Sequence, residues 1–101
     1  MTVKKKFFKK NGRCQVTLSL PKTLTNGASK VAVLGDFNQW NPEANPMEHL
    51  KNGSFKAVLS LEKGHSYQFR YLIDGNLWEN DPEADEMVPN FHGSQNSLIH
   101  T

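Results

Sequence analysis

Both tryptophans of the chain stand among polar residues, where an aromatic side chain is able to form a binding surface. Trp40 ends the stretch 35–40 (GDFNQW) and begins a polar loop, whereas Trp78 follows an Asp-Gly turn and borders acidic residues. An indole ring can cover the apolar C–H face of a sugar, while amide and guanidinium groups hydrogen-bond the hydroxyls at its rim. The affinity of such a contact comes from buried apolar area, at roughly 25 cal/mol per Å² before the costs of association. The other interpretation, that one or both indoles belong to the core, stays open on the residue pattern alone.

The residues that commonly carry catalysis or metal binding form no recognisable pattern. No histidine has the spacing of a zinc site with another histidine or with the single cysteine, Cys14. The histidines are His49, His65, His92 and His100. A nucleophilic serine needs a positioned base, and neither a Gly-x-Ser-x-Gly elbow nor a phosphate-binding glycine loop occurs. We therefore expect no enzyme activity, no metal and no other cofactor.

An acidic run over 79–86 is the nearest approach to the carboxylate pair of a glycosidase. Its members are Glu79, Asp81, Glu83, Asp85 and Glu86. They lie in a stretch without apolar alternation, and the barrel loops that normally surround such a pair are missing. We therefore interpret the run as a solvated loop, and a fragment of a glycoside hydrolase ranks last among the functions considered.

Strands must position the tryptophans, because apolar and polar residues alternate along most of the chain. Strands are expected over 13–20, 30–35, 54–61, 65–73 and 97–100, with a short strand around Phe7 and Phe8. Asn-Gly, Lys-Gly and Asp-Gly pairs separate several of them and favour tight turns. No segment has helical spacing; 22–29 and 36–46 are expected to be loops, and 79–94 irregular. The pattern predicts an all-β, immunoglobulin-like antiparallel sandwich.

The chain has 101 residues, which suits a single domain over 1–101, with a basic strand or arm over 1–12 and the sandwich over 13–100. The lysines near the N-terminus favour a solvated edge strand that resists aggregation. A nucleic acid or an anionic membrane is the alternative reading of this basic run, but no matching basic stripe follows, so we expect neither partner. No apolar run has the length of a signal peptide or a membrane span, and a cytoplasmic location is therefore expected.

Residues 31–42 (VAVLGDFNQWNP) resemble the strand-and-loop signature of the family 48 carbohydrate-binding modules. The resemblance continues through 67–75 (YQFRYLIDG), Trp78 and 80–82 (NDP), and ends at 93–99 (GSQNSLI), so it covers about 13–100. This family includes the glycogen-binding domain of the AMP-activated protein kinase β subunit and the N-terminal early-set domains of isoamylases and glycogen branching enzymes. Within this family, the chain most resembles small bacterial stand-alone proteins of isoamylase early-set type.

The resemblance implies a sandwich of early-set type that binds glycogen, starch or maltooligosaccharides without acting on them. The two tryptophan platforms of the family fall on Trp40 and Trp78, and a basic residue that contacts hydroxyls falls on Arg70, where the kinase domain has lysine. The late loop supplies Ser94 and Asn96, and a leucine of the kinase domain aligns with His92. The chain also departs from the family pattern by one extra residue, Leu77, between the Asp-Gly turn and Trp78.

A protein-interaction module is the alternative function. Many early-set domains of enzymes have lost glucan binding, and their tryptophans then pack on the neighbouring catalytic domain. The same apolar surface would then dock on a glycogen-metabolism enzyme without binding sugar, since exposed aromatic patches mark partners of both kinds. The residues indicate no particular oligomeric state.

Overall fold

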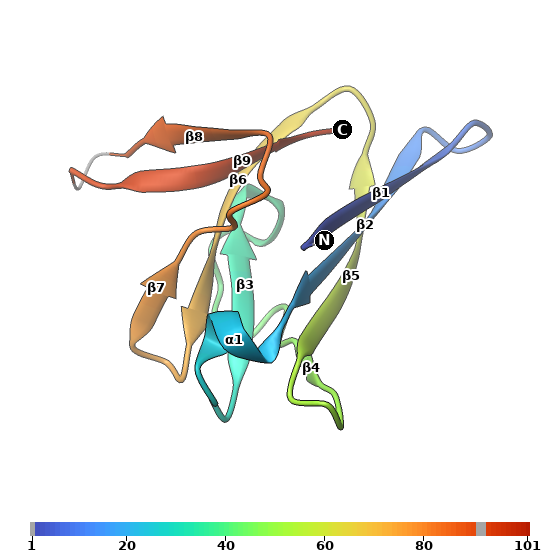
Figure 1. The fold of residues 1–101 in the computed structure, drawn as a ribbon. Helices are drawn as coiled ribbons and strands as arrows, with labels where there is room; N and C mark the ends of the chain where they lie inside the picture. Colours follow the sequence, from blue (N-terminus) through green and yellow to red (C-terminus); the bar gives the residue numbers. More distant parts are fainter. Residues whose placement is uncertain (1, 91–92) are drawn as a thin grey trace.

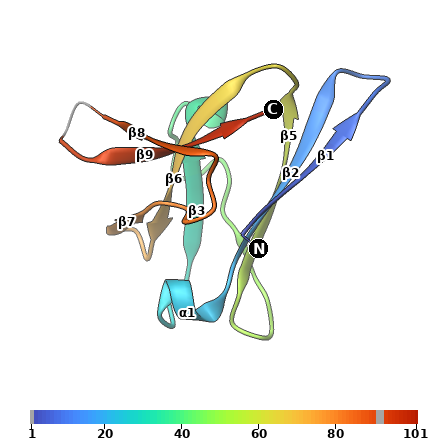
Figure 2. The same cartoon turned by 45° about the horizontal axis from the view of Figure 1, so that its top comes forward.

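The computed structural model describes residues 2–90 and 93–101 and consists of two antiparallel β-sheets that face each other (Figures 1 and 2). The first sheet has the strand order β1-β2-β5-β4, with bounds Val3–Phe8, Arg13–Leu20, Phe55–Glu62 and Glu48–His49 in that order. The second has the order β3-β6-β9-β8, with bounds Val31–Gly35, Ser66–Ile73, Gln95–His100 and Glu86–Pro89. Strand β7 (Leu77–Glu79) also pairs with β6. The predicted all-β antiparallel sandwich is confirmed.

Alternating hydrophobicity determines which face of each strand is buried. In β2, Cys14, Val16, Leu18 and Leu20 are buried while the residues between them are partly exposed. Strand β5 packs beside β2 in antiparallel register, with Cys14 opposite Leu61. The buried side chains of both strands face the second sheet, because the period of a strand places every other residue on the same face. Cys14 is therefore a small core residue.

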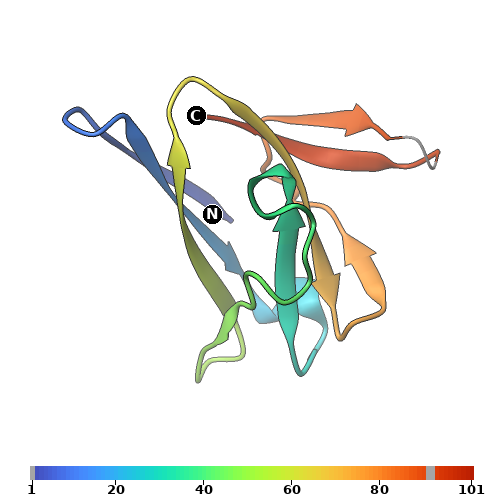
Figure 3. The ribbon, with the colours of Figure 1, turned by 180° about the vertical axis from the view of Figure 1, so that it is seen from behind.

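Strand β6 separates the core from the outer face of the second sheet. Phe69, Tyr71 and Ile73 are buried between the sheets, as the alternation predicts. Gln68, Arg70 and Leu72 point to the opposite side, since successive side chains of a strand alternate between faces. The outer face of β6 therefore presents polar groups beside the loop that follows β3. Figure 3, the view from behind, shows this loop at the end of β3 next to β6.

Several short elements were not predicted, including the two-residue strand β4. Helix α1 (Lys22–Thr25) and the 3-10 turn η1 (Asp36–Asn38) lie in the stretches expected to be loops, since a single turn is too short to show helical spacing. Strand β8 lies in the stretch expected to be irregular. Both of its faces are largely exposed, so its residues carry no apolar alternation.

A buried polar cluster joins the N-terminal strand to the segment between β7 and β8. Asp81 is fully buried, and its carboxylate accepts hydrogen bonds from the hydroxyls of Thr2 and Tyr71 and from the backbone N–H of Glu83. Burial, followed by the negative charge of Asp81 and this hydrogen bond, raises the pKa of Tyr71 well above its ordinary value. Through Asp81, the cluster therefore connects the residue before edge strand β1 of the first sheet to strand β6 of the second sheet.

Candidate functional site

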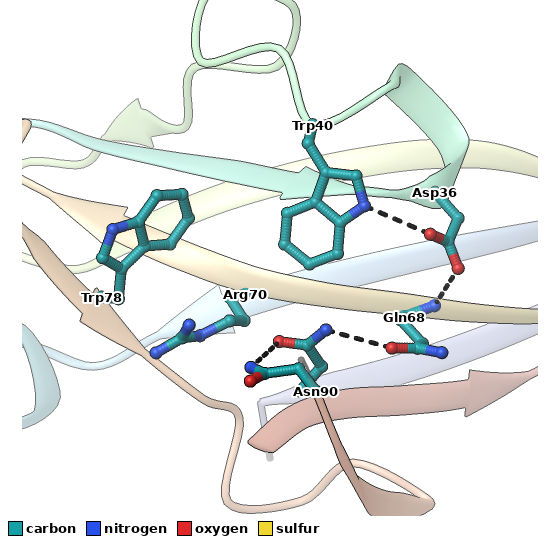
Figure 4. Close-up of a pocket in the computed structure, with 7 residues that line it drawn as sticks. Asp36, Trp40, Gln68, Arg70, Trp78 and Asn90 are labelled. Carbon is teal, nitrogen blue, oxygen red and sulfur yellow. Dashed lines mark hydrogen bonds between the residues drawn. The ribbon is translucent and has the colours of Figure 1, made fainter. Parts of the chain in front are cut away.

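A pocket of about 680 Å³ lies on the outer face of the second sheet (Figure 4). Strand β6, strand β7, the loop after β3 and the hairpin of β8 and β9 contribute to it. Its lining residues are Asp36, Trp40, Gln68, Arg70, Trp78, Asn90 and Asn96. Segments that are far apart in the sequence therefore meet here because β6 pairs with β3, β7 and β9.

Strand geometry places Arg70 beside Trp78. Trp78 on β7 is directly opposite Leu72 of β6, and Arg70 lies two residues before Leu72 on the same face. The Arg70 guanidinium carbon is 5.3 Å from the centroid of the Trp78 ring. Trp78 is 41% exposed, so its indole is open to solvent on the outer face rather than part of the core.

The backbone of the loop after β3 brings Trp40 to the other side of the pocket. The Asn38 side chain accepts a hydrogen bond from Gly35 N–H and donates to the carbonyl of Val33 and the side chain of Asn45. The N–H of Trp40 donates to Gly35 O. Gly35 is required because a Cβ there would lie 2.5 Å from the carbonyl oxygen of Gln68. Trp40 is half-buried and faces the pocket, as Figure 4 shows.

A chain of amide hydrogen bonds forms the polar part of the pocket. Asn90 Nδ2 donates to Asn96 Oδ1 over 3.1 Å, and Asn96 Nδ2 donates to Gln68 Oε1 over 3.0 Å. Asn96 is only 8% exposed, so its amide mainly orients the two amides beside it. Because Asn96 donates to Gln68 Oε1, the Gln68 amide is oriented with its donor, Nε2, directed away from Asn96.

The residues predicted for the site are distributed as follows. Trp40, Arg70, Trp78 and Asn96 are brought together in the pocket lining. Ser94 lies in the turn between β8 and β9, where its backbone N–H donates to Asn90 Oδ1, and it is not among the lining residues. His92 lies outside the described residues.

The sequence interpretation missed Asp36, Gln68 and Asn90. Gln68 shares the outer face of β6 with Arg70, so strand alternation could have identified it. Asp36 stands within the motif that contains Trp40, but nothing in the motif indicates that its side chain reaches the indole. Asn90 enters the site only through the pairing of β8 with β9, which the sequence pattern does not predict.

The composition of the lining favours binding over chemistry. Among the lining residues that the structure describes, Asp36 is the only carboxylate, so the pocket contains no carboxylate pair of the glycosidase kind. Within residues 2–90 and 93–101, no three His, Cys, Asp or Glu side chains are grouped as a metal site would need. No helix in the described part of the chain is long and apolar enough to cross a membrane.

Comparisons with known proteins agree with this geometry. Residues 22–101 match the family model described as the glycogen recognition site of AMP-activated protein kinase. The chain is also 40% identical over 60 residues to the 1,4-alpha-glucan branching enzymes GlgB 2 of two strains of Xanthomonas campestris pv. campestris. This alignment covers 56% of the chain but 8% of each enzyme. The family match spans most of the sandwich and includes every residue that lines the pocket, and the chain therefore belongs to the glycogen-recognition family of carbohydrate-binding modules, which is a non-catalytic family.

Proposed function

We propose that the pocket binds a chain of α-1,4-linked glucose units, such as glycogen, starch or a maltooligosaccharide, and does not cleave it. The observation that carries this proposal is the presence of Trp40 and Trp78 in one solvent-accessible pocket together with Arg70 and Gln68. The description of the matched family, which names glycogen, supports the choice of sugar. The names of the aligned enzymes, which act on α-1,4-glucan, support it as well.

In this proposal the indoles of Trp40 and Trp78 are platforms that cover the apolar faces of glucose units. Arg70 lies beside Trp78 and Gln68 lies on the other side of Trp40, near Asp36 (Figure 4), and in this proposal their side-chain N–H groups hydrogen-bond hydroxyls. Arg70 Nε is buried and has no hydrogen-bond partner among the described residues, so a shift of this side chain toward a hydroxyl would satisfy a donor that the protein leaves unpaired. Ser94 and His92 are proposed as additional contacts from the β8–β9 turn for longer chains.

A titration followed by tryptophan fluorescence tests the proposal. Maltoheptaose and β-cyclodextrin are expected to cause saturable quenching, because both place apolar sugar faces over an indole. Cellohexaose, whose β-1,4 linkage gives a straight chain, is the matched control ligand and is expected to give a much weaker response. No response to any α-glucan at millimolar concentration would contradict the proposal.

Substitution of Trp40 assigns the signal to the pocket. Trp40→Ala is expected to abolish the quenching while the circular dichroism spectrum is unchanged. The control is Phe7→Ala, which removes an aromatic side chain that is 51% exposed on β1, in the other sheet. Equal loss of binding in both variants would show that the pocket is not the site. An assay for reducing sugar released from starch checks that the glucan stays intact.

A protein partner is the second candidate function. The aligned relatives are much longer enzymes, in which the similar segment forms a small part of the chain. Leu77 and Met87 are 52% and 38% exposed and lie outside the pocket lining, on the side of β7 and β8 opposite to the pocket, so exposed apolar side chains are available to a partner away from the proposed sugar site. Binding to a glucan branching enzyme without any response to sugar would favour this function over the first.

A further inference from the structure

The carboxylate of Asp36 connects the indole of Trp40 to strand β6. Its Oδ1 accepts a hydrogen bond from Trp40 Nε1 over 3.2 Å, and its Oδ2 accepts one from the backbone N–H of Gln68 over 2.9 Å (Figure 4). Strand β3 ends at Gly35, opposite Phe69, so the N–H of Gln68 lies just past the end of this backbone ladder. The side chain of Asp36 takes the place of the next backbone acceptor.

The position of Trp40 needs such a support. Gln39 and Trp40 both adopt left-handed backbone conformations, with φ of 55° and 57°, which residues other than glycine seldom occupy. Asn38 and Gly35 hold the backbone of this loop through the hydrogen bonds described above. None of these bonds involves the indole, so the backbone and the ring of Trp40 are held by separate groups.

We infer that Asp36 is a positioning residue for glucan binding, which holds the Trp40 indole with its face open to the pocket. The inference rests on the proposed function. The bond to Asp36 satisfies the one polar atom of the indole at its edge, so a sugar meets only the apolar ring face. Because the ring is already ordered before the sugar arrives, binding does not have to include the cost of ordering it.

Removal of this support is expected to weaken binding without abolishing it. Asp36→Ala should lower the affinity for β-cyclodextrin by up to roughly tenfold, the scale of immobilising one flexible side chain. Asp36→Asn is the conservative variant. Its side chain retains one acceptor oxygen, which can serve Trp40 or Gln68 but not both, and an intermediate affinity is expected. The control is Asp74→Asn. Asp74 follows the last residue of β6, and one of its oxygens, Oδ1, accepts the backbone N–H bonds of both Ser29 and Lys30, so asparagine can keep both bonds.

Nuclear magnetic resonance of the indole N–H groups separates positioning from a general structural effect. In Asp36→Ala the Trp40 indole proton is expected to move upfield and its heteronuclear NOE to fall, because the ring loses its acceptor. The Trp78 signal should stay in place, and Trp40→Phe assigns the two signals. A Trp40 signal unchanged in Asp36→Ala, or full affinity in a variant whose ring has become mobile, would overturn the inference. If the wild-type protein bound no α-glucan, the proposed function would fall, while the indole signals would still decide whether Asp36 holds Trp40.

Discussion

The guanidinium carbon of Arg70 lies 5.3 Å from the centre of the Trp78 ring, so that a cation on β6 covers an indole on β7. The two residues are diagonal neighbours on the outer face of the second sheet. A cation over an indole contributes about 0.5–1 kcal/mol at an exposed site. The contact orders Trp78 although the residue lies on a short strand, and it places the charge of Arg70 beside a ring that the proposal assigns to sugar binding.

Replacement of Trp78 by alanine is expected to weaken maltoheptaose binding by about thirtyfold. The estimate corresponds to about 2 kcal/mol for the apolar contact area of an indole. The fold should remain, because Trp78 is 41% exposed and contributes little to the core. Isothermal titration calorimetry measures the affinity, and circular dichroism checks the fold.

Leu77 provides the control for this substitution. It precedes Trp78 on β7, is 52% exposed and does not line the pocket. Leu77→Ala removes a comparable exposed apolar side chain from the opposite face of the same strand, and its affinity for maltoheptaose should equal that of the wild type. If both variants lost affinity equally, the loss would reflect damage to β7 rather than the absence of a sugar contact.

The sequence was most informative where alternation and burial coincide. The predicted limits of β2, β5 and β6 are correct to within one residue, because Phe69, Tyr71 and similar residues face a continuous core. The end of the chain was less predictable. Strand β8 is exposed on both sides and is held by its pairing with β9, which is a long-range property that no local pattern contains.

The site was predictable to a similar extent. Trp40 was identified by its polar surroundings as well as by its motif, whereas Arg70 was identified because its motif resembles a known family. Asp36 and Gln68 were not, because aspartate near a turn and glutamine on an exposed strand face are common in any β-protein. Their roles depend on two atoms meeting across β3 and β6, and this distance is set by the register of the sheet.

The amide chain allows stability and binding to be separated. Asn96→Ala removes the donor to Gln68 Oε1 and the acceptor of Asn90, and should lower the free energy of unfolding by about 1–3 kcal/mol. It should also weaken maltoheptaose binding severalfold, because the Gln68 amide is no longer oriented. Urea denaturation and calorimetry measure the two effects.

The control for Asn96 is Asn80. Its side chain is also hydrogen-bonded on both sides, to Gln95 O and to the Ser97 hydroxyl, but it does not line the pocket. Asn80→Ala is therefore expected to lower stability while the sugar affinity stays at the wild-type value. A loss of affinity in Asn80→Ala that matched the loss in Asn96→Ala would indicate that only overall stability matters.

Tyr71→Phe tests the buried cluster around Asp81, which connects the two sheets. The variant removes the hydroxyl that donates to Asp81 Oδ2 over 2.6 Å, and the free energy of unfolding should fall by about 1.5–3 kcal/mol, the scale for a hydrogen bond to a charged group. Sugar affinity should not change, because Tyr71 is buried behind the pocket. Tyr67→Phe is the control, since the Tyr67 hydroxyl accepts a bond from Glu62 N–H near the surface and contacts no buried carboxylate among the described residues.

The same variant predicts a difference at alkaline pH. The pKa of Tyr71 is raised well above its ordinary value by burial and by Asp81. A pKa that is higher in the folded state than in the unfolded state stabilises the folded protein. This stabilisation is fully present below the unfolded pKa of about 10 and is lost as the pH rises through the folded pKa. The wild type should therefore lose stability above about pH 10 more steeply than Tyr71→Phe. Parallel curves for the two proteins would contradict the buried position of the phenol.

The ion pair between Lys5 and Asp85 gives the opposite pH dependence. Lys5 Nζ and the backbone N–H of His100 both donate to Asp85 Oδ2, over 2.6 and 2.8 Å. Desolvation by burial raises the pKa of Asp85, but the Lys5 hydrogen bond, the His100 N–H and the positive charges together outweigh it, so the pKa is lowered. A lowered folded pKa gives stability that is present above the unfolded value of about 3.9 and is lost as the pH falls through the folded pKa.

Lys5→Ala should therefore destabilise the protein at pH 7, by less than about 1 kcal/mol for a partly exposed pair, and this difference should shrink as the pH falls below about 4. Urea denaturation at pH 7 and at pH 3 measures it. Lys4→Ala is the control, because Lys4 points to the other face of β1 and is exposed. A Lys5→Ala deficit of the same size at both pH values would mean that the side chain acts through packing of its methylene groups, since that contribution does not depend on the charge of Asp85.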